Sequence, residues 1–230
     1  MTDVAHVAEN LRRVREAVAE AAVRSGRSAD AVRLVAVSKR HEEAAIRAAY
    51  AAGQRDFGEN YVQEARAKAE AIDLPDLCWH YIGQLQSNKA KYVARFAHWC
   101  HSVDSAKLAD ELSHRCGVEG RTLQVLMQVN MVGEEQKGGA SPEEAPELLE
   151  HMLALPNLEV QGLMTMPPFW SAERVRPIFA RVAKLRDELA AQFDVTLPEL
   201  SMGMSGDFEA AIAEGATMVR VGTAIFGARE

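Results

Sequence analysis

The sequence predicts a parallel (β/α)8 barrel that begins with a helix. Eight short apolar segments alternate with helical patterns along the 230 residues, each repeat taking about 20 to 40 residues. No GxGxxG motif follows the first strand, which disfavours an open, doubly wound sheet. We therefore expect one α/β domain over residues 1–230.

The predicted elements follow one another in a regular order. Apolar residues at helical spacing predict an amphipathic helix over residues 3–24, ahead of the first strand. The sequence ends three residues after Gly227, so no eighth helix is expected behind the last strand, and we predict that the helix at 3–24 takes that position. The eight expected strands cover residues 33–39, 56–58, 78–83, 99–103, 122–129, 158–164, 200–204 and 216–221.

Local signals place two of the helix ends. Ser141 and Glu144 form a capping-box pattern with Pro142 at the first helical position, which predicts a helix from there to about Leu155. A short helix over 208–214 is expected between the last two strands, with Ser205 and Asp207 as N-cap candidates. A glycine-bounded loop is expected over residues 222–227.

Composition limits the possible functions. With 48% hydrophobic and 26% charged residues, the chain can bury one sizeable core, and no linker-like stretch divides it. The net charge of −7 argues against a nucleic-acid-binding surface. The charged N-terminus lacks an apolar export segment and no later stretch approaches a membrane span, so we expect a cytoplasmic protein without membrane partners.

The cysteines and histidines do not predict a metal site. Cys78, Cys100 and Cys116 are scattered and odd in number, which predicts buried thiols without a disulfide framework. His98, Cys100 and His101 lie close in sequence, but only His98 and Cys100 share a strand face, and no second ligand pair is evident. We therefore expect no metal.

Polar residues follow the expected strands at one rim of the barrel. The carboxyl ends of the strands are where active sites lie in this fold. The residues at this rim are Lys39, Asn60, Gln84, Asp104, Asn130, Ser205 and Thr223. The site is therefore expected at this end.

Lys39 closes the first apolar strand. Its amine would lose its charge more readily when desolvated in a barrel mouth, and it would then attack an aldehyde. The alternative is a lysine that extends to the rim without a chemical role. Ser205, Gly222 and Thr223 follow the last two strands, where this fold commonly binds phosphate.

Arg220 lies inside the last apolar strand and therefore needs a partner. It could form an ion pair with a core carboxylate, or it could contact a ligand. In a closed barrel the first strand neighbours the eighth, which places Lys39 beside Gly222 and Thr223. A ligand with an aldehyde at one end and a phosphate at the other fits this arrangement, and pyridoxal 5′-phosphate is such a ligand.

These residues resemble the family of pyridoxal phosphate homeostasis proteins, relatives of the alanine racemase N-terminal barrel. The resemblance covers nearly the whole chain. It rests on LVAVSK at 34–39, FGENYVQEA at 57–65, WHYIGQLQSNK at 79–89, SVDS at 102–105, GLMTMP at 162–167, LSMGMSGDFEAAI at 200–212 and MVRVGTAIFG at 218–227.

The resemblance implies a role for each site residue. Lys39 would hold the cofactor as a Schiff base, Arg220 would face the pyridine nitrogen, and Asn60 would line the ring. The phosphate would lie against Ser205, Gly222 and Thr223. The resemblance implies a protein that buffers pyridoxal phosphate or delivers it to apo-enzymes. We expect it to be a monomer.

Two enzymatic alternatives remain: an amino-acid racemase of low activity, or a Schiff-base aldolase acting on a phosphorylated sugar. A guanidinium at the pyridine nitrogen keeps that nitrogen unprotonated, which disfavours transamination. Racemisation needs two acid/base groups, and related racemases take the second, a tyrosine, from an extra domain. Robust catalysis is therefore not expected. His80 is expected to be a hydrogen-bonded core histidine, and Met164 and Met204 are expected to reach the pocket.

Overall fold

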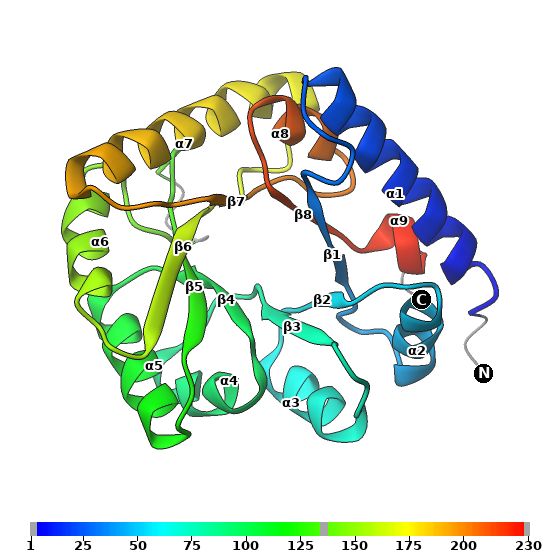
Figure 1. Cartoon of the computed structure of the whole chain (residues 1–230), viewed down its shortest axis with the longest axis horizontal. Coiled ribbons are helices and arrows are strands. Elements are labelled where there is room, and N and C mark those ends of the chain that lie inside the picture. Colours follow the sequence, from blue (N-terminus) through cyan, green and yellow to red (C-terminus); the bar gives the residue numbers. More distant parts are fainter. Residues whose placement is uncertain (1–3, 134–137, 228–230) are drawn as a thin grey trace.

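The chain forms a closed barrel of eight parallel strands surrounded by helices (Figure 1) in the computed structural model, which describes residues 4–133 and 138–227. The strands pair in chain order and β8 returns to pair with β1, so each strand has two neighbours. This arrangement confirms the predicted barrel. The strands are β1 Arg33–Val37, β2 Asp56–Glu59, β3 Cys78–Tyr81, β4 Trp99–Val103, β5 Leu123–Gln128, β6 Leu158–Met164, β7 Glu199–Ser201 and β8 Met218–Val221.

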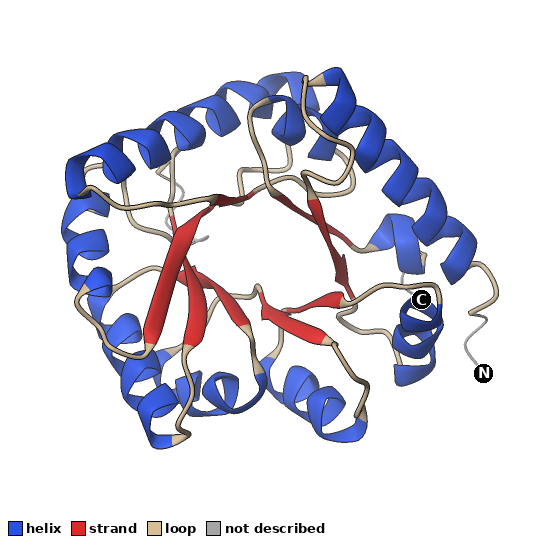
Figure 2. Ribbon diagram, viewed as in Figure 1, coloured by secondary structure: helices blue, strands red, loops and turns tan. Residues whose placement is uncertain are grey.

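The helices form the outer ring around the strands (Figure 2). Apolar residues on the inner face of each helix pack against the outer face of the sheet, which gives the main core. The helices are α1 Val7–Arg24, α2 Glu43–Ala51, α3 Val62–Ala71, the 3₁₀ turn η1 Ser87–Lys89, α4 Ala90–Phe96, α5 Ala106–Val118, α6 Ala145–Leu153, α7 Ala172–Phe193, α8 Phe208–Ala213 and α9 Thr223–Phe226.

Helix α1 closes the outer ring where the last strand meets the first. It packs against α2, α8 and α9, and Figure 1 shows it running along this side of the barrel. Its buried face includes Leu11, Val14 and Val18. Asn10 donates a side-chain hydrogen bond to the Ile225 carbonyl at 3.1 Å, which ties α1 to α9. The predicted position of this helix is confirmed, although it begins at Val7 and residue 3 lies outside the described residues.

The barrel interior is only partly apolar. Trp99, Leu126, Met164 and Met218 form a small interior cluster from four strands. The remaining interior positions carry polar side chains such as His80 and Ser201, and both are fully buried. Because buried polar groups are costly unless they are hydrogen-bonded, the barrel must supply partners for them.

Several element ends differ from the sequence prediction. The capping box is present, since Glu144 N–H donates to Ser141 Oγ at 3.2 Å and Ser141 N–H donates to the Glu144 carboxylate at 2.9 Å. Residues 141–144 nevertheless form a turn, and α6 begins at Ala145. The expected glycine loop over 222–227 contains the one-turn helix α9, because the carbonyls of Gly222 and Thr223 accept intrahelical bonds. Residues 134–137 of the loop after β5 lie outside the described residues.

Within residues 4–133 and 138–227, no helix is both long enough and apolar enough to cross a membrane.

Candidate functional site

A cavity of about 320 Å³ opens at the carboxyl ends of the strands. Loops that follow β1, β2, β6, β7 and β8 contribute its walls. All six residues that the sequence analysis assigned to cofactor binding line it: Lys39, Asn60, Ser205, Arg220, Gly222 and Thr223. The fold therefore brings together residues from both ends of the sequence.

The other predicted rim residues lie outside this cavity. Gln84 lines a neighbouring hollow together with Tyr61 and Lys89. Asn130 lines a different, much smaller space between the loops after β5 and β6. Asp104 follows β4 and does not line the cavity. The rim position alone therefore selects more residues than the site contains.

Lys39 is held through its two neighbours in the chain. Lys68 Nζ donates to the Ser38 carbonyl at 2.7 Å, and Ser38 Oγ donates to the Glu59 carboxylate at 2.7 Å. On the other side, Arg40 N–H donates to the Glu64 carboxylate, and Arg40 has the left-handed φ of 63°. The backbone on both sides of Lys39 is therefore tied to one buried cluster.

That cluster is an ion-pair network centred on Lys68. The Lys68 ammonium lies 2.7 Å from the Glu59 carboxylate and 2.6 Å from that of Glu64. Burial raises the pKa of Glu59, and the attraction of Lys68 and the Ser38 hydrogen bond oppose this shift. Removing one partner of a buried ion pair typically costs about 3–5 kcal/mol, because the other charge is left uncompensated. The network is therefore a strong local constraint on the position of Lys39.

Asn60 presents an unsatisfied acceptor beside the cavity. Its Oδ1 atom is buried and has no hydrogen-bond partner among the described residues. Its backbone is fixed by Tyr81, whose hydroxyl donates to the Asn60 carbonyl at 3.2 Å. A Cβ atom at Gly83 would lie 2.1 Å from the same carbonyl oxygen, so only glycine permits this contact. A buried polar atom without a partner is a sign of a missing ligand group.

The opposite wall is formed by the loops after β7 and β8. Ser205 and Thr223 contribute hydroxyl groups, and Gly222 lies against β1, where a Cβ atom would meet the Val37 carbonyl at 3.1 Å. Asp207 also lines the cavity, and its carboxylate accepts a hydrogen bond from the Met204 N–H at 2.6 Å. Burial raises the pKa of Asp207.

Arg220 spans the floor of the cavity. Its Nη1 donates to Ser201 Oγ at 2.7 Å and its Nη2 donates to the Thr165 carbonyl at 3.0 Å. Burial lowers the pKa of Arg220 to about 10, so the guanidinium stays charged at neutral pH, and the attraction of Asp207 opposes the shift. No described carboxylate forms an ion pair with it. The core ion pair considered for Arg220 is therefore wrong, and the ligand contact stays a prediction.

Several cavity residues are missing from the sequence prediction. Met166, Phe169 and Trp170 line the mouth from the loop after β6. Met204 reaches the cavity as expected, but Met164 belongs to the apolar cluster inside the barrel, so that expectation is wrong. The position of TMPPFW directly after a strand was the available signal for the three mouth residues.

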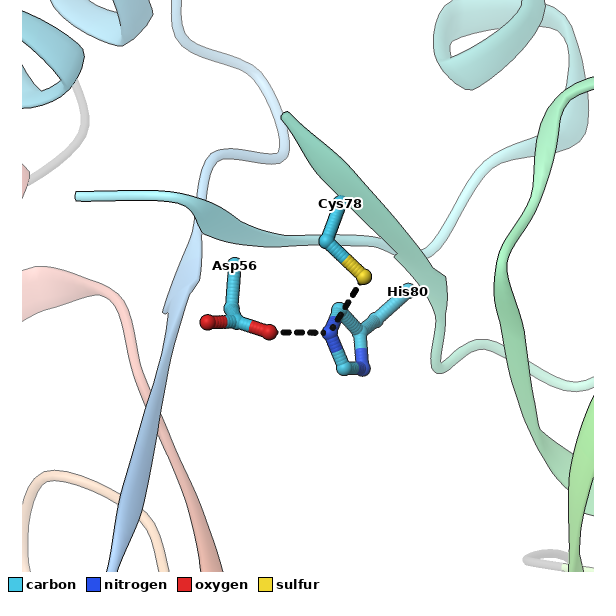
Figure 3. Close-up of side chains that lie close together, drawn as sticks. All are labelled: Asp56, Cys78 and His80. Carbon is cyan, nitrogen blue, oxygen red and sulfur yellow. Dashed lines mark hydrogen bonds and ion pairs between the residues drawn. The ribbon is translucent and has the colours of Figure 1, made fainter. Parts of the chain in front are cut away.

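A group of potential metal ligands lies at the opposite end of the barrel. Figure 3 shows Asp56 and Cys78, at the starts of β2 and β3, both pointing toward His80. Three potential metal-ligand atoms of these residues lie within 4.8 Å of one another. Neither His98 nor Cys100 is part of this grouping. His80 is a fully buried, hydrogen-bonded histidine, as predicted.

Comparison with known proteins first establishes the class. The sequence matches the family model described as alanine racemase, N-terminal domain, over residues 2–230. The closed barrel that begins with a helix, with its cavity at the carboxyl ends of the strands, is therefore a barrel of the alanine racemase N-terminal type.

Closer relatives then establish the family. The pyridoxal phosphate homeostasis protein of Pseudomonas aeruginosa is 50% identical over 225 residues, covering 97% of this chain and 96% of the relative. The protein of the same name from Aquifex aeolicus is 48% identical over 223 residues, covering 96% of this chain and 98% of the relative. This chain belongs to the family of pyridoxal phosphate homeostasis proteins, which confirms the resemblance carried by its motifs.

A solved structure supports the same assignment. PipY of Synechococcus elongatus, described with PLP bound, is 43% identical to this chain and superimposes with a TM-score of 0.86. The match covers 96% of this chain and 100% of the PipY chain.

Proposed function

We propose that this protein binds pyridoxal 5′-phosphate through Lys39 and takes part in intracellular homeostasis of the cofactor, buffering it or delivering it to apo-enzymes. The observation that carries the proposal is the single cavity that Lys39, Arg220 and the loops after β7 and β8 share. The bound cofactor in PipY and the names of the two homeostasis proteins support it.

The cavity fits this cofactor in size and chemistry. Its volume of about 320 Å³ lies at the lower end of the range for small-ligand sites. The guanidinium of Arg220 and the ammonium of Lys39 offer positive charge to an anionic ligand. Asn60 Oδ1 offers an acceptor that has no partner within the described protein.

Each residue has a distinct part in the proposed binding. When bound, pyridoxal phosphate supplies an aldehyde that a lysine amine attacks to form a Schiff base. The Lys68 cluster holds the backbone beside Lys39, so the amine starts from a defined position. Ser205, Gly222 and Thr223 would hold the phosphate with hydroxyl and backbone N–H groups, and Arg220 would hold the ring nitrogen unprotonated.

The arrangement favours a carrier over a racemase. Racemisation needs a second acid/base group on the opposite face of the substrate. None of the four tyrosines lines the cavity in the part of the chain that the structure describes; Tyr61 and Tyr81 line the neighbouring hollow instead. We therefore propose a carrier without robust catalysis, and an assay for D-alanine formation tests the racemase alternative. The carrier is proposed to act as a monomer.

Substitution of the anchor lysine tests the proposal. After pyridoxal phosphate has been added to the purified protein and the unbound cofactor removed by desalting, the protein should keep visible absorbance because of the Schiff base, whereas a phosphosugar aldolase would be colourless. Lys39→Ala should abolish this absorbance and leave only reversible binding through the phosphate. Lys89→Ala, which changes a lysine of the neighbouring hollow, is the matched control and should keep the absorbance.

Borohydride reduction followed by peptide mass mapping identifies the attachment point. The pyridoxyl group is expected on Lys39. Its recovery on another lysine, or an unchanged spectrum of Lys39→Ala, would contradict the proposal.

A further inference from the structure

A continuous row of buried polar side chains leads away from Arg220 through the barrel interior. Ser201 Oγ lies 2.7 Å from Arg220 Nη1 and 2.9 Å from His101 Nδ1. His101 Nε2 lies 2.9 Å from His80 Nδ1. At the far end, His80 Nε2 lies 2.9 Å from Asp56 Oδ1 (Figure 3). The five residues belong to β8, β7, β4, β3 and β2, so the row crosses the barrel.

The middle of the row is shielded from solvent. Ser201, His101 and His80 are each 0% exposed. The ring of Trp99 stacks on His80 with centroids 5.7 Å apart and meets His101 edge-on. Because water does not reach these groups, each of them must satisfy its hydrogen bonds from the next member of the row.

The two ends of the row determine where every proton lies. Arg220 can only donate hydrogen bonds, so Ser201 Oγ accepts from it and has its own proton left to give to His101 Nδ1. A neutral His101 then carries its proton on Nε2 and donates to His80 Nδ1.

His80 in turn carries its proton on Nε2 and donates to the Asp56 carboxylate, which can only accept. Burial lowers the pKa of both histidines, so both rings are neutral, as this arrangement requires. With its proton on Nε2, His80 does not offer that atom to a metal beside Asp56 and Cys78.

We propose that Ser201, His101, His80 and Asp56 are positioning residues for Arg220: they form a hydrogen-bond chain with one direction that holds the guanidinium at the floor of the cavity. This hydrogen-bond chain runs from the Arg220 guanidinium, which we propose contacts the ring nitrogen, to the Asp56 carboxylate at the opposite end of the barrel. It deepens the proposed function, on which its consequence for cofactor binding rests.

The direction of the hydrogen bonds in this row can be measured without any cofactor. Long-range ¹H–¹⁵N correlation spectra of the cofactor-free, ¹⁵N-labelled chain report which nitrogen of each histidine carries the proton. His80 and His101, assigned through His80→Gln and His101→Gln, should both be neutral with the proton on Nε2. His114, exposed on α5 and outside the row, serves as the reference ring. A proton on Nδ1 of either buried ring, or a charged ring, would overturn the proposal.

The consequence for Arg220 is tested by removing one hydroxyl. A hydrogen bond to a charged group is worth enough that Ser201→Ala should weaken pyridoxal phosphate binding about tenfold. Ser102→Ala removes another buried serine hydroxyl, which contacts Cys100 Sγ at 3.7 Å and no member of the chain, and should bind within about twofold of the parent.

The outcomes separate this proposal from the proposed function. A parent protein that binds no pyridoxal phosphate would refute the proposed function. The positions of the histidine protons would still decide whether the hydrogen bonds of the row all run in one direction. A folded Ser201→Ala that binds as tightly as the parent would mean that the row does not position Arg220. If Ser201→Ala does not fold, Ser201→Thr, which keeps the hydroxyl, should retain the parent's affinity, and its failure to do so would count against the proposal.

Discussion

Two buried cations flank the cavity, and the protein compensates their charges in different ways. Lys68, behind Lys39, has carboxylates of Glu59 and Glu64 within 2.7 Å. Among the described residues, the Arg220 guanidinium donates to two neutral acceptors, Ser201 Oγ and the Thr165 carbonyl. Asp207 attracts it without forming an ion pair, and the carboxylate at the end of its row belongs to Asp56 on the other side of the barrel.

The difference follows from what each cation does. Lys68 does not line the cavity, and its direct ion pairs anchor the backbone beside Lys39. Arg220 lines the cavity, where a directly paired carboxylate would occupy the donors that a ligand needs. Neutral acceptors hold the guanidinium in place and leave its remaining donors available. A carboxylate in direct contact with the cation therefore favours stability, whereas neutral acceptors around the cation favour ligand binding.

The largest expected effect comes from breaking the direct pair. Glu59→Ala removes a fully buried carboxylate and should lower the free energy of unfolding by about 3 kcal/mol, because Lys68 loses the more deeply buried of its two counter-charges. Urea unfolding followed by circular dichroism measures the change. Glu20→Ala, exposed on α1, is the matched control and should unfold like the parent. A Glu59→Ala protein as stable as the parent would show that Glu64 alone suffices for Lys68.

A smaller effect is expected from the serine beside Lys39. Ser38 and Ser201 are both fully buried, and each hydroxyl lies 2.7 Å from a charged side chain, Glu59 or Arg220. Ser38→Ala should lower the free energy of unfolding by about 2 kcal/mol, the worth of a hydrogen bond to a charged group.

Only one of these two serines belongs to the row of histidines. Ser38→Ala should therefore leave the histidine protons of the parent unchanged, as seen in the same correlation spectra. If Ser38→Ala changed the positions of those protons, the Lys68 network and the row at Arg220 would be coupled. They could then not be compared as two independent ways of compensating a buried charge.

The smallest effect is the pH dependence of stability that each buried histidine on the Arg220 side adds. Burial lowers the pKa of His80 and His101, so below about pH 6.5 the unfolded chain binds more protons than the folded one. Stability should therefore fall as the pH drops from 6.5 to 5.5, by at most about 1.4 kcal/mol per histidine for each pH unit. The charged groups that face this pair are Asp56, Arg33, Glu199 and Arg220.

Urea unfolding at pH 7.5, 6.5 and 5.5 measures this slope. His101→Gln should reduce it by about one histidine's share. Ser102→Ala, which removes a buried hydroxyl and no titrating group, should leave the slope as in the parent. Equal slopes in the parent and in His101→Gln would rule out a neutral His101 as the source.

Much of the site follows from strand order. Lys39, Asn60, Ser205, Gly222 and Thr223 each lie one to four residues after the end of a strand, and in a closed parallel barrel all such positions meet at one rim. The same rule could not exclude Gln84, Asp104 and Asn130, because rim position does not tell which loops turn inward. Met164 was misplaced for a related reason: a strand pattern does not show how deep in the barrel a residue lies.

The sequence by itself determined the barrel, the position of α1 and six of the residues that line the cavity, because a closed parallel barrel gathers the ends of its strands at one rim. It did not determine what lies behind those residues. Lys68 meets the Ser38 carbonyl across 30 positions of the chain, and His101 meets Ser201 across 100. Such pairs depend on which residues of different strands reach the same height inside the barrel. That height is set by strand register and side-chain packing, which only the tertiary structure decides.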